Sequence, residues 1–438
     1  MQVSRVFRDI VSVFSSNIFG VLAGLCSGIL IARFLGPEGR GIFAALATVP
    51  ILVLSISALG LRRATLFHIA SPESDNNKVI SALVILWMFS SVLGMSVAGF
   101  MFSEMDELVY TKAITLPVIL IIPIELIISY VGGLYLGVEN FRMVNRIRMG
   151  KPFLFVVLLC ISLLVMDFGI VGVAWSYFGA SFTVAISVAL IARKKFKFDF
   201  IYDFAYLKSL LKLGLQFAMA FFVIQLNLRL DILLLGKWST TDQVGFYSVG
   251  VTVAEQLWQL PMAVGIVVTS KTASVESRQE MDRKIGPLLR LSLLAGLLSA
   301  FALYLVIPYL LPLVYGAEFI PSISAVRLML PGVIMFLVFR ILNSRLDGFG
   351  KPMIGVSLTI PGLILNVILN YFLIPKYGAY GAAVATDISY ALMMVLMLFT
   401  YSRVAQISLP NLLFYRKTDF QWIRIFLNHK LLKTKSKV

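Results

Sequence analysis

The chain has 438 residues, of which 59% are hydrophobic and 14% are charged, and its formal net charge is +16 at pH 7. Soluble domains carry about 25% charged residues, so this composition excludes an ordinary water-soluble globular protein. We expect an all-α integral membrane protein, because helices satisfy their own backbone hydrogen bonds in lipid and the alternating pattern of a transmembrane barrel is absent.

Twelve apolar stretches have about the length that a helix needs to cross a bilayer, roughly 20 residues. The fifth is the shortest, and little more than Asp167 separates it from the sixth. The predicted spans are residues 11–33, 41–60, 79–102, 113–136, 152–166, 168–192, 209–236, 245–269, 286–313, 322–344, 353–374 and 379–401.

The distribution of Lys and Arg predicts the orientation of these spans. With the N-terminus inside, the segments that face the cytoplasm hold 30 of these residues and the segments that face outside hold 5. Short cytoplasmic loops carry such an excess, so both ends of the chain are predicted to lie in the cytoplasm. The basic tail, residues 404–438, would face anionic membrane lipids, and the net charge requires no nucleic acid as a partner.

The first glycines of the chain form a run with a spacing of four residues, at Gly20, Gly24 and Gly28 in the first predicted span. Small residues at this spacing let two membrane helices approach closely. We interpret the run as a helix-packing surface, with a mobile packing contact as the alternative.

Two pairs of similar segments indicate an internal repeat. LGPEGRGIFAALATV (35–49) is matched by LGKWSTTDQVGFYSVGVTV (235–253), and FGIVGVAWS (168–176) is matched by YGAYGAAVA (377–385). Six spans in each half mean that both halves enter the membrane from the same side, as a parallel repeat does. We therefore expect two six-helix bundles, 1–198 and 199–403, that form a V-shaped transporter working by alternating access.

Three arginines lie inside predicted spans, at Arg229, Arg327 and Arg340. Guanidinium groups stay charged and match phosphate oxygens in pairs, so one interpretation is a cationic cavity for an anionic headgroup. The alternative is that Arg229 or Arg327 forms an ion pair with Asp231 or Glu255, since buried charges are normally paired. Arg33 and the Arg62–Arg63 pair stand near span ends, where basic side chains usually extend to the membrane surface. A role at the mouths of a substrate path is the alternative.

Polar residues also share helix faces in the second half of the chain. Ser248, Thr252, Glu255 and Gln259 follow helical spacing and predict one polar stripe on the eighth span. Together with Asn227 in the seventh span, Gln259 is a candidate contact for the substrate.

Four carboxyl groups in the spans are candidates for ion coupling: Glu125, Asp231, Glu255 and Asp387. A carboxyl group in a low dielectric favours its protonated form and is able to exchange protons. The alternative for each is a static acid whose hydrogen bonds hold helices together.

Several absences bear on catalysis. The sequence has no G-x-x-x-x-G-K-[ST] pattern for binding nucleotide phosphates, and His68 and His429 lack metal-ligand spacing. No soluble segment is large enough to house a catalytic site. We therefore expect a transporter rather than an enzyme, with no catalytic residue, no metal and no cofactor.

ARFLGPEGRGIFAAL (32–46) resembles the opening signature of bacterial polysaccharide biosynthesis proteins, the oligosaccharide-lipid flippases of the multidrug/oligosaccharidyl-lipid/polysaccharide exporter superfamily. RLDILLLGKWSTTDQVGFYSV (229–249) resembles the start of their second half, and LDGFGKP (346–352) and KYGAYGAAVAT (376–386) fit as well. The matching residues are Arg33, Gly36, Pro37, Glu38 and Gly39 in the first segment and Arg229 and Asp231 in the second, whereas Arg40 replaces a common aromatic.

This resemblance covers the whole chain and implies a flippase of the bacterial inner membrane. Such proteins move a sugar repeat unit on an undecaprenyl-pyrophosphate carrier to the outer leaflet, for O-antigen, capsule or exopolysaccharide assembly. The implied partners are the lipid-linked anionic oligosaccharide, membrane lipids and a polysaccharide polymerase complex. A proton- or sodium-coupled multidrug exporter of the same superfamily is the alternative, although intramembrane arginines suit an anionic lipid better than a cationic drug. A scaffold without transport activity is a third possibility.

Overall fold

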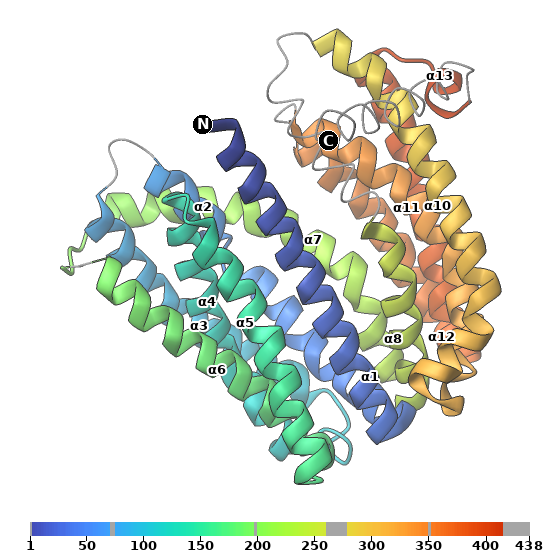
Figure 1. The fold of residues 1–438 in the computed structure, drawn as a ribbon, viewed down its shortest axis with the longest axis horizontal. Helices are drawn as coiled ribbons and strands as arrows, with labels where there is room; N and C mark the ends of the chain where they lie inside the picture. Colours follow the sequence, from blue (N-terminus) through green and yellow to red (C-terminus); the bar gives the residue numbers. More distant parts are fainter. Residues whose placement is uncertain (1, 71–74, 197–198, 260–277, 349–351, 415–438) are drawn as a thin grey trace, which may run out of the picture. The chain divides into compact units, whose positions relative to one another are not determined.

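The computed structural model describes residues 2–70, 75–196, 199–259, 278–348 and 352–414 (Figure 1). These residues form helices and turns, and the described part of the chain contains no β-strand. Nine of its helices are long and apolar enough to cross a membrane. The expectation of an all-α, multi-pass membrane protein is therefore confirmed.

The helices follow the predicted spans in order along the chain. Their bounds are α1 Gln2–Ser57, α2 Leu61–Ala70, α3 Asn76–Ser103, α4 Lys112–Gly137, α5 Phe141–Cys160, α6 Gly169–Lys195, α7 Phe204–Trp238, α8 Thr241–Ala254, α10 Arg278–Tyr315, α11 Ser322–Gly348, α12 Pro352–Ala405 and α13 Leu409–Leu413. A π-helical turn, Ile161–Val165, follows α5, and short 3-10 turns lie at Glu255–Trp258 and Ala317–Phe319.

Two of the helices are broken by a glycine and each covers two predicted spans. Helical geometry is interrupted in α1 at Gly36, with φ of 64°, and in α12 at Gly378, with φ of 54°. Only glycine adopts this left-handed geometry without a steric cost. Gly36 therefore separates the spans predicted at 11–33 and 41–60, and Gly378 separates those predicted at 353–374 and 379–401.

The fifth predicted span differs most from the structure, and part of the eighth lies outside the described residues. The fifth, expected to begin at residue 152, begins at Phe141, where the side chain of Asn140 accepts a hydrogen bond from the Met143 N–H and caps the helix. The helical start was missed because its polar first turns resemble a loop. The eighth, predicted at 245–269, is helical through α8 and a 3-10 turn, and its remainder lies outside the described residues.

The described chain divides into two compact units. Unit 1 contains Met1–Val249 with two short insertions, Leu311–Pro321 and Ile374–Ala379, and unit 2 contains the described residues of the remainder. Residues 199–249 thus belong to unit 1, although the sequence repeat assigns them to the second bundle. The boundary of the predicted bundles at residue 198 stays a prediction.

Helix α4 supplies a central stripe to the core of unit 1. Buried residues follow each other at intervals of four, which places them along one side of the helix. They are Ile114, Val118, Ile122 and Leu126, none more than 1% exposed, and they pack in one cluster with apolar residues of α1, α2, α3, α6 and α7. This packing holds α2 and α4 side by side, which positions the site described below.

In unit 2, aromatic rings from three elements form a buried stack. Trp258 lies in the 3-10 turn after α8, Phe336 in α11 and Tyr390 in α12. The ring centroids of Phe336 and Tyr390 are 4.4 Å apart, and those of Trp258 and Phe336 are 5.2 Å apart. Such pairs add to the stabilisation that apolar burial provides.

The connector before α7 is fastened to the start of α3. Lys78 Nζ lies 2.9 Å from Asp203 Oδ2, and the Ile201 N–H donates to Ser81 Oγ over 2.9 Å. The Lys78 hydrogen bond and a second one from the Tyr206 N–H hold the pKa of Asp203 below its ordinary value. Asp203 thereby links α3 to the first turn of α7.

This link should make a small, acid-sensitive contribution to stability. A carboxyl group whose pKa is lowered by folding stabilises fully above its ordinary value of about 4 and loses that contribution as the pH falls through its lower folded value. We expect Asp203→Asn to lower the melting temperature at pH 7 by no more than about 2 °C, because exposed ion pairs are weak. Thermal unfolding in detergent between pH 7 and pH 3 should show a smaller acid effect in this variant than in Asp199→Asn, whose carboxyl has no such partner among the described residues. Equal acid sensitivity in both variants would contradict the assignment.

Candidate functional site

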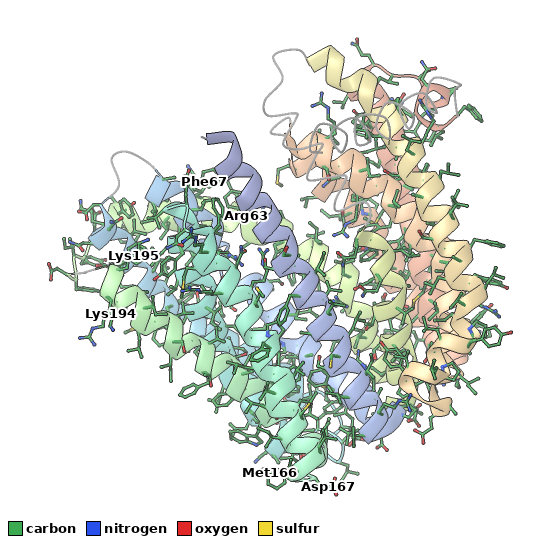
Figure 2. The ribbon with its side chains drawn as sticks, in the orientation of Figure 1. Arg63, Phe67, Met166, Asp167, Lys194 and Lys195 are labelled. Carbon is green, nitrogen blue, oxygen red and sulfur yellow. The ribbon has the colours of Figure 1, made fainter. Side chains whose placement is uncertain are left out.

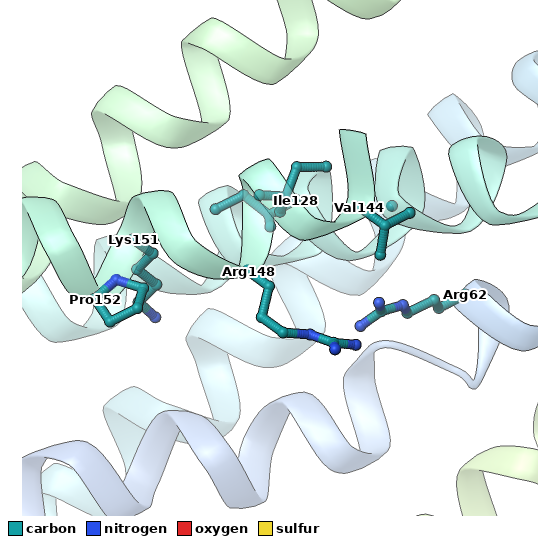
Figure 3. A pocket seen from close by; sticks show the side chains of 8 residues that line it. Arg62, Ile128, Val144, Arg148, Lys151 and Pro152 are labelled. Carbon is teal, nitrogen blue, oxygen red and sulfur yellow. The ribbon is translucent and has the colours of Figure 1, made fainter. Parts of the chain in front are cut away.

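A pocket of about 190 Å³ opens in unit 1 between α2, α4 and α5 (Figure 3). Three cationic side chains, from Arg62, Arg148 and Lys151, share its wall with small and apolar residues. The remaining lining residues are Ile128, Gly132, Val144, Ile147 and Pro152. No acidic residue lines the pocket itself.

One face of α5 supplies most of this wall. Val144, Ile147, Arg148 and Lys151 are separated by three, one and three residues, so their side chains leave the helix on the same side. The cations therefore reach the pocket because α5 begins at Phe141, one turn before Val144. A helix that began at residue 152 would have left them in a loop.

The guanidinium groups of Arg62 and Arg148 point toward each other from α2 and α5 (Figure 3). Protein atoms around the Arg62 guanidinium lower its pKa, and the neighbouring charges of Arg148 and Arg63 lower it further, although the side chain is exposed at the pocket. Arg148 Nη1 donates to Asn17 Oδ1 over 2.7 Å. Among the described residues, Arg62 has neither an ion-pair partner nor a hydrogen-bond partner, so this positive pair is uncompensated.

Lys151 is the cation of the pocket that does have a counter-ion. Its Nζ lies 2.5 Å from Glu125 Oε1 on α4, and the same carboxylate oxygen accepts a hydrogen bond from Ser181 on α6 over 2.7 Å. Lys151 also lies over the ring of Tyr177, 4.5 Å from its centroid. The ammonium and the carboxylate neutralise each other, and the two guanidiniums account for the excess charge.

Two like charges facing one opening repel each other unless an anion lies between them. A phosphate group has the geometry to accept paired hydrogen bonds from a guanidinium, and such bonds are about twice as strong as neutral ones. The arrangement of Arg62 and Arg148 therefore fits a site for a phosphate or diphosphate group. Two neighbouring guanidiniums without a counter-ion repel each other, and a bound anion would remove this repulsion.

The arginines that the sequence singled out in unit 2 contact different groups. Arg327 lies over the Tyr304 ring, 4.2 Å from the centroid, and its Nη2 donates to the Tyr304 carbonyl over 3.2 Å. Arg340 lies 4.9 Å from the centroid of Trp258 and 5.6 Å from that of Phe336. Its Nη1 is buried without a hydrogen-bond partner among the described residues. Their role as substrate contacts stays a prediction.

The predicted polar residues of α7 and α8 are only partly brought together. Asn227 is buried and its amide has no hydrogen-bond partner among the described residues, while Asp231, one turn later, accepts a 2.8 Å hydrogen bond from the Tyr247 hydroxyl. Arg229 is half-buried on the same helix. Gln259 is exposed at the end of the 3-10 turn.

The polar stripe predicted on the eighth span is interrupted before its last member. The α-helix ends at Ala254, and the 3-10 turn that follows advances by a third of a turn per residue instead of about 100°. Glu255, the first residue of this turn, keeps the phase set by Ser248 and Thr252, whereas Gln259 leaves it by about 80°.

Of the four carboxyl groups proposed for ion coupling, Glu125 is the one that borders the pocket, through Lys151. Asp387 lies in unit 2 against Gly332 of α11, and its Oδ1 is buried without a hydrogen-bond partner in the described structure. Glu255 is half-buried at the start of the 3-10 turn. Ion coupling by these acids stays a prediction.

Sequence reasoning missed the pocket because it assigned its cations to loops. The sequence favours membrane-surface anchoring for Arg62 and Arg63, with the mouth of a substrate path as the alternative; in the structure, the guanidinium carbon of Arg63 lies 5.5 Å from the centroid of the Phe217 ring. Arg62, its neighbour in α2, lines the pocket. The helical spacing of Arg148 and Lys151 with Val144 was the signal that would have placed them on one face.

For two members of the first glycine run, the packing interpretation stays a prediction. Among the described residues, nothing lies within 4 Å of a Cβ built on Gly20 or Gly24, so no described helix of unit 1 packs closely against them. At Gly28 the same atom would meet the guanidinium of Arg40 at 3.7 Å.

Comparison with known proteins bears on this arrangement. The profile of the polysaccharide biosynthesis protein family matches residues 6–270, which is more than half of the chain and includes the whole pocket. The chain belongs to this family. The family resemblance seen in the sequence signatures is thus confirmed.

Curated relatives in the family include transporters of glycans. A probable low-salt glycan biosynthesis flippase of Haloferax volcanii, Agl15, is 29% identical over 38% of this chain and 36% of its own length. A putative O-antigen transporter of Shigella flexneri is 26% identical over 38% of this chain and 40% of its own length. The chain thus aligns with well under half of each. The probable flippase AglR of Haloferax volcanii is 24% identical over 90% of this chain and 83% of its own length.

Solved structures share the fold. Lipid II flippase MurJ, in an inward closed conformation, superposes with a TM-score of 0.74 at 15% identity and covers 96% of both chains. An inward-facing multidrug resistance MATE family transporter superposes with a TM-score of 0.70 at 19% identity, over 88% of this chain and 94% of its own. The fold is therefore that of MurJ and MATE transporters, and these relatives are transporters or flippases rather than enzymes.

Proposed function

We propose that this protein is a flippase for an undecaprenyl-pyrophosphate-linked oligosaccharide repeat unit, which it moves from the cytoplasmic to the outer leaflet of the bacterial inner membrane. The observation that carries the proposal is the uncompensated Arg62–Arg148 pair, which would bind the diphosphate of the carrier. The glycan-transporting relatives support the same substrate class. The sugar would serve O-antigen, capsule or exopolysaccharide assembly, with a polymerase complex as a further partner.

The proposed topology has twelve crossings with both ends in the cytoplasm, arranged as bundles 1–198 and 199–403 that rock to give alternating access. The charge distribution supports this orientation. In unit 1, Arg63, Lys194 and Lys195 lie at one end and the Met166–Asp167 turn lies at the other (Figure 2). Basic residues gather at the cytoplasmic side of membrane proteins, so the pocket would face the leaflet in which the substrate is made.

Vesicles that contain the purified full chain test the proposal. The substrate is a short-chain prenyl diphosphate sugar in the inner leaflet, and its appearance outside is followed by periodate oxidation of the exposed sugar. We expect protein-dependent appearance of the diphosphate lipid, and none for the same prenyl sugar without phosphate. A multidrug exporter, the alternative that the MATE fold allows, would instead expel a cationic dye and leave the lipid in place. That outcome would overturn the proposal.

A further inference from the structure

The side chain of Arg148 is held at the pocket by a residue that does not line it. Arg148 Nη1 donates to Asn17 Oδ1 of α1 over 2.7 Å, and within the described part of the chain Arg148 makes no other hydrogen bond. Its guanidinium points toward that of Arg62 (Figure 3). Arg62 lies instead against α4, where its guanidinium carbon is 3.9 Å from a Cβ built on Gly132. The direction in which Arg148 faces therefore depends on a contact from α1, outside the pocket wall.

Neighbouring contacts fix the register of α1 against α5. Ser16 Oγ donates to Asn145 Oδ1 over 3.1 Å, and both residues are buried. One turn along, the ring centroids of Phe19 and Phe153 are 6.5 Å apart. The partners advance in the same direction along both helices, so α1 and α5 run parallel here. Asn17 lies between these two contacts, which hold its side chain close to α5.

An asparagine is suited to orient a guanidinium that also has to bind an anion. Its amide oxygen accepts a hydrogen bond but carries no charge, so Arg148 keeps its positive charge and its other N–H donors. A carboxylate at residue 17 would instead form an ion pair, of the kind that Lys151 forms with Glu125, and an entering phosphate would have to displace it. Fixing Arg148 beforehand also removes part of the side-chain entropy that anion binding would otherwise cost.

We propose that Asn17 is a positioning residue of the diphosphate site, because it aims the Arg148 guanidinium at the pocket without neutralising it. This inference rests on the proposed function, since it takes the pocket to bind the diphosphate. The guanidiniums of Arg62 and Arg148 match the two negative charges of a diphosphate diester, and a neutral amide leaves that balance unchanged. Asn17 acts on the anion through Arg148.

Isothermal titration calorimetry on the full chain in lipid nanodiscs tests this role with a double-mutant cycle. The probe is farnesyl-diphospho-N-acetylglucosamine, a diphosphate diester. Asn17→Ala should raise its Kd about three- to tenfold, the effect of one hydrogen bond of ordinary strength. In an Arg148→Gln background the same substitution should change the Kd by less than about twofold, because the guanidinium that Asn17 positions is gone. In an Arg62→Gln background it should have its full effect.

Asn17→Asp separates positioning from support of the fold. The new carboxylate would pair with Arg148, so the Kd should rise at least about tenfold. The melting temperature without probe should stay unchanged or rise, because the carboxylate offsets the repulsion between Arg148 and Arg62. A residue that only supported the fold would lose stability and binding together. Ser16→Ala is the matched control: it removes the neighbouring hydrogen bond between α1 and α5 and should change the Kd by less than about twofold.

The outcomes separate this inference from the proposed function. An unchanged Kd in Asn17→Ala, or an effect of Asn17→Ala that persists in the Arg148→Gln background, would overturn the positioning role and leave the proposed function standing. Equal losses of binding in Ser16→Ala and Asn17→Ala would also overturn it, since the packing of α1 on α5 would then set the affinity. Failure of the unmodified protein to bind the probe would overturn the proposed function, and this inference with it.

Discussion

Replacing Arg62 and Arg148 together by glutamine should weaken binding of a prenyl diphosphate sugar by at least about a hundredfold and reduce its translocation in parallel. A hydrogen bond to a charged group contributes about 1.5–3 kcal/mol, and about 1.4 kcal/mol corresponds to a factor of ten in Kd. Both guanidiniums face the pocket, so the double variant removes both contributions. Each single variant should lose about tenfold or more. Calorimetric binding and the vesicle assay measure the two effects.

The matched control is Arg63→Gln. Arg63 follows Arg62 in the same helix but lies over the Phe217 ring and outside the pocket, so its loss should change binding by less than about threefold. Stability supplies a second readout. Because Arg62 and Arg148 repel each other, neutralising either should leave the melting temperature unchanged or raise it. Equal losses of binding in Arg63→Gln and Arg62→Gln would show that general surface charge, not the pocket, attracts the substrate.

The helices of this protein were predictable because their signal is local. Each predicted span lies on an observed helix where the structure describes it, since a run of about 20 apolar residues can satisfy its backbone in lipid in only one common way. The errors fall where a helix begins with polar residues instead of apolar ones. The first three turns of α5 carry Arg142, Arg148 and Lys151, and a polar helix start next to a membrane is indistinguishable from a loop by hydropathy alone.

The pocket was less predictable because it depends on which helices become neighbours. Glu125 stood out in the sequence as an acid in an apolar span, but its partner is Lys151 on the next helix, and no local pattern indicates that pairing. The arginines of the second half were singled out for the same reason as Glu125, because they are charged residues in apolar spans. The structure gives Arg327 a carbonyl partner and Arg340 aromatic neighbours, so charge in a span locates buried polar groups without assigning their roles.

The repeated signatures meet in the structure through their glycines. Gly41 stands in the second arm of α1 and Gly245 in the first turns of α8, one in each of the matched segments 35–49 and 235–253. A Cβ on Gly41 would overlap the carbonyl oxygen of Thr241, and a Cβ on Gly245 would overlap that of Pro37. Each helix thus lies against the backbone at the start of the other, within unit 1.

Gly41→Ala and Gly245→Ala should therefore each destabilise the protein by about 3 kcal/mol, the upper end of the usual cost of overpacking, because a backbone carbonyl has little freedom to move aside. The double variant should cost less than the sum, since the first added methyl already separates the two helices and relieves the second contact. Thermal unfolding in detergent measures all three.

Gly24→Ala, in the first arm of α1, is the matched control. Nothing lies within 4 Å of the added methyl among the described residues, so the better helix propensity of alanine should leave stability equal or higher by up to about 1 kcal/mol. The effect of alanine on the free energy of unfolding is expected to have opposite signs at Gly24 and Gly41 of the same helix. A general intolerance of α1 to alanine cannot produce this pattern. Full additivity of the two damaging substitutions would show that α1 and α8 do not share the contact.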